Sequence, residues 1–129
     1  MTELARARCT IGSEHAAVVT LLNRRFMRGV GDSVEVRVQL PVRFMPRSEP
    51  QPDFALVRHT ADTYRHGHPT AKDILLLVEI SDSTLRYDLG VKARLYATHG
   101  VAEYWAADLV ANRVWRHRKP SGPQYLERP

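Results

Sequence analysis

The stretch of residues 74–100 constrains the fold of this chain more than any other part. It opens with five consecutive apolar residues, 74–78, which are bounded by polar ones. Such a run predicts a strand that is buried on both of its faces. Glu79 follows at the point where we expect the strand to leave the core. Because a buried carboxylate without a partner is costly, the sequence predicts that Glu79 has a partner close by.

A turn and a helix are predicted after this strand. Residues 81–84 read SDST and are rich in side chains that bind backbone N–H groups, which indicates a turn. Helical spacing then connects Leu85, Leu89, Lys92, Leu95 and Tyr96, and Gly100 is placed to end the helix. A strand that delivers a carboxylate, followed by a helix that delivers a lysine, fits a metal-dependent catalytic site.

Composition indicates a single globular domain. The 129 residues are enough for one domain, 1–129, and the hydrophobic content of 43% and charged content of 26% are ordinary. Cys9 is the only cysteine, so an intrachain disulfide is impossible, which fits a cytoplasmic location. The longest apolar run has five residues, too few to span a membrane, and we therefore expect no membrane partner.

The chain is basic, with 19 Lys and Arg against 14 Asp and Glu and a net charge of +5. A basic surface favours polyanions such as nucleic acid. The arginines are scattered along the sequence, however, so charge alone is a weak indicator of a nucleic-acid partner.

The N-terminal third is predicted to form a helix and a strand. Ser13 is expected to cap a helix over residues 13–28, whose apolar face holds Ala17, Val18, Leu21, Leu22 and Phe26. Glu14 in its first turn is interpreted as favouring the helix dipole. For His15, a position at the edge of an active site and a purely structural role both stay open.

Apolar and polar residues alternate over residues 34–44, which predicts a half-buried strand, or two strand pieces bent at Pro41. A turn over 46–52, a short strand over 54–58 and a loop over 59–72 follow. The loop contains the pair His66 and His68, but zinc sites need three or four ligands, so we favour a solvated loop.

Residues 103–108 and 113–118 are predicted to form a hairpin with its turn near 111–112. The tail, 119–129, is polar and holds three prolines, and we expect little regular structure there. The predicted element order is α-β-β-β-α-β-β, an α/β (α+β) arrangement.

Asp53 and Glu79 each lie at a strand boundary, on two strands that one loop connects, so these strands are expected to be antiparallel neighbours. Carboxylates on adjacent strands can hold one Mg²⁺ through oxygen ligands. Lys92 can then orient or deprotonate the attacking water, or stabilise the charge of the transition state. Asp88 is four residues before Lys92 and can face the same site. The alternative interpretation makes Lys92 a surface lysine paired with Asp88.

These residues and their neighbours resemble a known family. The pattern consists of Pro52-Asp53, an apolar strand ending at Glu79, the SDST turn, Asp88, Lys92, Tyr96 and GVAEYW at 100–105. It resembles the Uma-two family of putative restriction endonucleases, part of the PD-(D/E)xK nuclease superfamily, over about residues 15–118. The resemblance implies a restriction-endonuclease-like core, in which a mixed β-sheet is flanked by helices. It also implies a Mg²⁺-dependent endonuclease acting on DNA, with Mn²⁺ as a possible substitute.

The resemblance assigns a role to several residues of this chain. Asp53 and Glu79 would be the metal ligands, and the backbone carbonyl of Ile80 would complete the metal's ligand shell. Ser81 occupies the position where the superfamily places its lysine, so the lysine role passes to Lys92. His15 matches a histidine common in the family's first helix, and Ser81, Asp88 and Tyr96 are expected to support the site. Family members usually have more sequence before the first helix and after the last hairpin, so we expect this chain to lack a strand pair and acidic groups that the N-terminal part would add.

Two other function classes remain open from the sequence. The first is a non-catalytic module that binds nucleic acid or a protein partner and keeps only the nuclease fold. The second is an oligomerising domain. Three aromatic residues of the last hairpin could form an apolar interface patch, which leads us to expect a homodimer through that hairpin; they are Tyr104, Trp105 and Trp115.

Overall fold

The computed structural model describes residues 12–128, so Cys9 and the rest of the first eleven residues lie outside it. Its centre is one six-stranded sheet with the strands in sequence order. All neighbouring strands are antiparallel except β3 and β4, which are parallel. The strands are β1 (Val34–Val38), β2 (Phe54–Arg58), β3 (Ile74–Ser81), β4 (Glu103–Asp108), β5 (Arg113–Ser121) and β6 (Gln124–Glu127).

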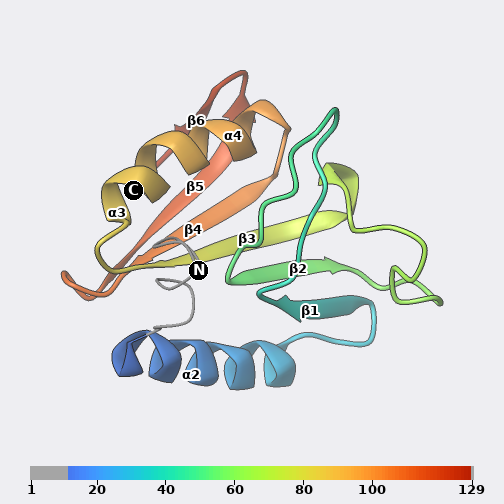
Figure 1. The fold of residues 1–129 in the computed structure, drawn as a ribbon, viewed down its shortest axis with the longest axis horizontal. Coiled ribbons are helices and arrows are strands. Elements are labelled where there is room, and N and C mark those ends of the chain that lie inside the picture. Colours follow the sequence, from blue (N-terminus) through green and yellow to red (C-terminus); the bar gives the residue numbers. More distant parts are fainter. Residues whose placement is uncertain (1–11, 129) are drawn as a thin grey trace, which may run out of the picture.

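Helices lie on both faces of this sheet (Figure 1). Helix α2 (Ser13–Gly29) covers one face. The opposite face carries a helical segment made of α3 (Leu85–Tyr87), the π-helical turn η2 (Asp88–Lys92) and α4 (Ala93–Thr98). The predicted mixed sheet flanked by helices is therefore confirmed, and it is consistent with a restriction-endonuclease-like fold.

Strand β3 runs through the middle of the sheet and is buried along nearly its whole length, as the apolar run predicted. Leu75 is the exception at 44% exposed. The strand continues to Ser81, so the expectation that it leaves the core at Glu79 is wrong: Glu79 is only 7% exposed. Hydrogen bonding explains the difference, because strand pairing with β4 extends to Ser81 and Asp108.

Helix α2 has the predicted length within one residue, but two details differ. Its N-cap residue is Gly12, and no side chain caps the helix, so Ser13 is the first helical residue and not the cap. Ala17 and Leu21 are exposed. The face that packs on the sheet consists instead of Val18, Val19, Leu22 and Phe26.

The continuous strand predicted for residues 34–44 is wrong beyond Val38. Gln39 adopts a left-handed backbone conformation, with φ of 55°, which ends β1 and turns the chain. Val42 and Phe44 are then fully buried on the opposite face of the sheet from Val34 and Val36. The alternative of two bent pieces was closer, but the bend is at Gln39 and not at Pro41.

The end of the helical segment is as predicted. Gly100 has a left-handed φ of 77°, which a glycine adopts without steric cost. The N–H groups of Gly100 and Val101 donate hydrogen bonds to the carbonyls of Ala97 and Tyr96, at 2.9 and 3.0 Å. This pair of bonds is a Schellman motif, and it satisfies two carbonyls at the helix end.

The tail is more ordered than predicted. Strand β5 continues to Ser121, and a two-residue loop with Gly122 at φ 58° leads into β6. Tyr125 of β6 is 3% exposed, and its hydroxyl donates a hydrogen bond to the carbonyl of Val101 at 2.7 Å. A hairpin with a glycine at the first loop position was therefore hidden in a segment whose polarity and prolines suggested a loop.

The predicted aromatic patch on the last hairpin is also wrong. Tyr104 is fully buried in the core. Trp105 packs beside Phe26 of α2, with ring centroids 6.3 Å apart, and Trp115 is partly buried against the core of the other face. Within residues 12–128, no helix is both long and apolar enough to cross a bilayer.

Candidate active site

Glu79 lies at the centre of a buried polar cluster at the C-terminal end of β3. Its Oε2 accepts a hydrogen bond from the hydroxyl of Tyr96 at 2.7 Å and lies 3.3 Å from Nζ of Lys92. Burial raises the pKa of Glu79 from 4.5 to about 7, because water that would stabilise the charge is excluded. The Lys92 ammonium opposes this rise, whereas the nearby Asp53 adds to it. The partner that the sequence predicted for Glu79 is therefore Lys92, together with Tyr96.

Tyr96 is a core residue of α4 that also has a polar function. It is fully buried, and its ring packs edge-on against Phe44 and Tyr104, with centroids 5.9 and 4.9 Å away. Burial and the neighbouring Glu79 raise its pKa, so the hydroxyl keeps its proton and donates to the carboxylate. These contacts fix one oxygen of Glu79 in place.

Asp53 lies just before β2, next to Glu79 across the sheet. Strands β2 and β3 are antiparallel, as predicted, with Phe54 opposite Val78 and Ala55 opposite Leu77. Because side chains alternate along strands, Asp53 and Glu79 continue the face of Ala55 and Leu77. Oδ2 of Asp53 accepts a hydrogen bond from the backbone N–H of Ile80 at 2.7 Å, which ties the two strand ends together.

Lys92 ends the π-helical turn η2, which begins at Asp88. Such turns are wider than an α-helical turn and are frequent at functional sites. The Lys92 side chain is 19% exposed, and its ammonium pairs with Glu79. The alternative interpretation, a surface lysine paired with Asp88, is therefore wrong. The hydroxyl of Tyr104 donates a hydrogen bond to the Asp88 carbonyl at 2.9 Å, within the same turn.

Asp88 binds the SDST turn and does not pair with Lys92. Its Oδ2 accepts hydrogen bonds from the hydroxyls of Ser81 and Thr84, at 2.7 and 2.9 Å. Burial raises the pKa of Asp88, and these two bonds oppose the rise. Ser81 is fully buried, so the position where the superfamily places its lysine holds a structural hydroxyl in this chain.

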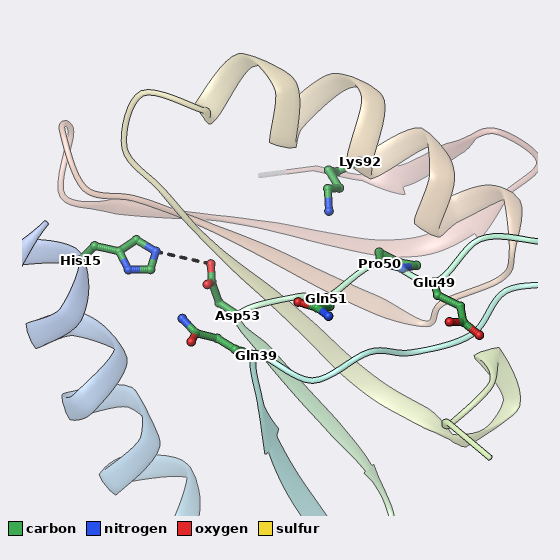
Figure 2. Close-up of a pocket in the computed structure, with 7 residues that line it drawn as sticks. All are labelled: His15, Gln39, Glu49, Pro50, Gln51, Asp53 and Lys92. Atoms are coloured by element: carbon green, nitrogen blue, oxygen red, sulfur yellow. Dashed lines mark ion pairs between the residues drawn. The ribbon is translucent and has the colours of Figure 1, made fainter. Parts of the chain in front are cut away.

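His15 approaches the site from α2, the helix on the other face of the sheet. Its Nε2 lies 3.7 Å from Oδ2 of Asp53, and its side chain is 18% exposed (Figure 2). Nδ1 is buried and has no hydrogen-bond partner among residues 12–128. His15 therefore lies at the edge of the candidate site, and its role there stays a prediction.

A cleft of about 540 Å³ opens over these residues. Lys92 points into it from the helical segment, while Asp53 and His15 lie on the opposite side (Figure 2). Sequence reasoning missed the other lining residues, which come from the loop between β1 and β2: Gln39, Glu49, Pro50 and Gln51. Gln39 had no signal in the sequence, although its backbone N–H donates to the Asp53 carbonyl at 3.0 Å. Glu79 lies beneath the cleft and not in its lining.

The donor set fits a hard cation better than zinc. Among the residues that the structure describes, no three or more His, Cys, Asp or Glu side chains group as metal ligands. Mg²⁺ needs only one or two carboxylates because it keeps several of its waters. Asp53 raises the pKa of Glu79, and a cation between two such carboxylates would relieve their repulsion. The Ile80 carbonyl as a further ligand stays a prediction.

The comparison with protein families agrees with this geometry. A family model named Uma2 and described as "Putative restriction endonuclease" matches residues 9–129, nearly the whole chain. The chain therefore belongs to the Uma-two family, as its motifs indicated, and membership supports a nuclease function in general. A search of curated proteins gave no match.

Proposed function

We propose that this protein is a Mg²⁺-dependent endonuclease that hydrolyses DNA phosphodiester bonds, with Mn²⁺ as an alternative cation. The observation that carries the proposal is the position of Glu79. This buried carboxylate, next to Asp53, is in contact with the Tyr96 hydroxyl and with the ammonium of Lys92, which lines the cleft together with Asp53. Glu79 differs in this from the buried Asp88, whose carboxylate accepts hydrogen bonds from the hydroxyls of the turn, because Glu79 pairs with an ammonium that lines the cleft.

In this proposal Asp53 and Glu79 hold the cation. When bound, the cation would supply Lewis acidity toward the phosphate and lower the pKa of a bound water. Tyr96 donates to one oxygen of Glu79 and so limits how the carboxylate can turn. The Ile80 N–H does the same for Asp53. His15 is a positioning residue that contacts Asp53 from α2.

Lys92 acts on the water and the developing charge. Its ammonium lines the cleft and also lies 3.3 Å from Oε2 of Glu79, so it can reach a group bound beside that carboxylate. A positioned cation of this kind stabilises the additional negative charge of a phosphoryl transition state. Tyr96 and Lys92 come from the same helical segment, which keeps their spacing fixed.

DNA as the substrate rests on the family description and on the net charge of +5. The test is nicking of a supercoiled plasmid by the parent protein with Mg²⁺, with Mn²⁺ or with EDTA, and with RNA as a parallel substrate. We expect nicking with either metal and none with EDTA. A protein that binds DNA and metal but never nicks would instead be the non-catalytic binding module.

The homodimer and the cytoplasmic location stay predictions. The aromatic patch no longer supports a dimer, because Tyr104 is buried and β6 covers the edge of β5. The edges of the sheet are β1 and β6. Light scattering at high protein concentration decides between monomer and dimer.

A further inference from the structure

A second pocket, separate from the cleft, brings together an arginine, a lysine and a histidine from three parts of the chain. It has a volume of about 240 Å³, and we call it the basic pocket; its lining residues are Arg43, Phe44, Met45, Thr70, Ala71, Lys72 and His99. Arg43 belongs to the loop between β1 and β2, Lys72 to the short 3-10 helix η1 (Ala71–Asp73), and His99 follows α4. These residues are spread over almost 60 positions of the sequence, so no run of charged residues predicted the pocket.

The walls of the basic pocket are held by contacts that do not involve its charges. The backbone N–H of Arg43 donates to the carbonyl of Pro69 at 2.7 Å, which joins the loop to the segment before η1. The His99 ring stacks on the buried Phe44 ring, with centroids 4.7 Å apart and planes 6° from parallel. The backbone of Arg43 and the ring of His99 are therefore held in place by contacts other than their charges.

The charge of the pocket is weakly neutralised within the described chain. None of its lining residues is acidic. The carboxylate closest to Arg43 is Glu49, with Nε 3.7 Å from Oε2, and both side chains are about half exposed. Such a surface pair contributes little and exchanges easily for another anion. Asp73 is already bound by Arg58 and by Thr70.

The basic pocket and the cleft share one loop. Glu49 and Pro50 line the cleft, whereas Arg43 and Phe44 line the basic pocket. The two arms of the loop are joined by a hydrogen bond from the Val42 N–H to the Pro50 carbonyl, at 3.0 Å, and by the pairing of Phe44 with Ser48. One loop, cross-linked by these bonds, therefore contributes walls to both sites.

We propose that the basic pocket binds backbone phosphate of the same nucleic acid whose scissile phosphate lies in the cleft. This inference rests on the proposed function. Arg43 and Lys72 would contact phosphate oxygens directly, and the pocket would contribute affinity and register without reading bases. Its volume is below the range typical of drug-sized ligands, which suits a phosphodiester group better than a whole cofactor.

The test compares two double variants that remove the same charge from two different pockets. Arg43→Gln with Lys72→Gln empties the basic pocket of its two permanent cations. The matched control is Arg94→Gln with Arg128→Gln, because these two residues line another pocket, of about 370 Å³, beside the helical segment and β6. Arg94 is two residues from Lys92, so the helix directs it away from the cleft.

Binding is measured by fluorescence anisotropy on a short labelled duplex over a series of salt concentrations, with Ca²⁺ in place of Mg²⁺ and again in EDTA. For the Arg43 and Lys72 variant, the slope of log K against log salt is expected to become shallower by about 1–2. Mn²⁺ binding should stay at the parent level. Glu49→Gln should tighten binding, because it removes the carboxylate beside Arg43.

Equal loss in both double variants would mean a general charge effect and would overturn the proposal. Parent-like binding by the Arg43 and Lys72 variant would overturn it as well, while leaving the nuclease proposal standing. If the parent protein binds no duplex in either buffer, both the basic-pocket proposal and the nuclease proposal are wrong. Thermal unfolding of each variant checks that the exposed substitutions leave the fold intact.

Discussion

Helix α2 covers one face of the sheet without a single fully buried residue, whereas the segment from α3 to α4 buries Ala93, Tyr96 and Ala97 against the other face. The second face also buries polar groups, Glu79, Ser81 and Asp88, and each of them is hydrogen-bonded. Among residues 12–128, helix α2 on the first face places one side chain at the rim of the site, that of His15.

The difference shows where a catalytic geometry can be held. A carboxylate stays within a few tenths of an ångström of a fixed position only if packed neighbours and hydrogen bonds lock its rotamer. Tyr96 links packing and hydrogen bonding at Glu79. Its ring is packed against Phe44 and Tyr104, and its hydroxyl donates a hydrogen bond to the carboxylate. The apolar, half-buried contacts of α2 could not provide the same precision.

The largest expected effect comes from Lys92→Ala. If Lys92 acts on the water and the developing charge, nicking should fall roughly 10²–10⁴-fold. Mn²⁺ binding should survive, because the carboxylates remain. Arg94→Ala is the matched control, since it removes a cation from the same helix at an exposed position. Nicking at the parent rate by Lys92→Ala would refute the role given to this lysine.

Two leucine truncations test the difference between the faces directly. Leu77 is fully buried on the α4 side, so Leu77→Ala should lower the free energy of unfolding by about 2–5 kcal/mol. Leu22 of α2 is only partly buried, and Leu22→Ala should cost about 1 kcal/mol. Urea unfolding followed by circular dichroism measures both. Equal losses would mean that α2 is packed as tightly as the opposite segment.

A smaller effect is expected from pH, through the raised pKa of Glu79. Its pKa is 4.5 when unfolded and about 7 in the folded protein, so folding takes up a proton between these values. The stability that this group contributes is full below pH 4.5 and is lost as the pH rises through 7. Relative to Glu79→Gln, which stays neutral, the metal-free parent should therefore lose on the order of 1–3 kcal/mol over this window.

The measurement is the free energy of unfolding of both proteins in EDTA at a series of pH values. His117 titrates in the opposite sense, because burial lowers its pKa, but it is common to both proteins and cancels in their difference. A difference that does not change with pH would mean that Glu79 is ionised throughout, with Lys92 outweighing the cost of burial.

Sequence patterns predicted the parts of the fold that local signals specify. Three local patterns each predicted one element that the structure contains. They are the apolar run of β3, the helical spacing up to Tyr96 and the glycine at position 100. Asp53, Glu79 and Lys92 came from the motif; Lys92 contacts Glu79, and Asp53 and Lys92 line the same cleft. Their strands and helix are consecutive in sequence, so few alternative arrangements exist.

The remainder depends on contacts between distant residues. No local sequence pattern indicated that Gln39 would adopt a left-handed backbone conformation, after which Val42 and Phe44 lie on the other face of the sheet. The partners of Asp88 depend on the turn at Ser81 and Thr84, and spacing along the helix pointed to Lys92 instead. Strand β6 is stabilised by burial of Tyr125 against the core, which composition could not show.

The most direct test of the central claim is calorimetric Mn²⁺ titration of four proteins: the parent, Asp53→Asn, Glu79→Gln and Asp88→Asn. The first two substitutions each remove a proposed ligand charge while keeping a hydrogen-bond acceptor for Ile80 or Tyr96. The third removes a buried charge that accepts hydrogen bonds from the hydroxyls of Ser81 and Thr84. We expect one Mn²⁺ on the parent and on Asp88→Asn, and none on the other two. Failure of the parent to bind Mn²⁺, or unchanged binding by Glu79→Gln, would contradict a metal site between Asp53 and Glu79.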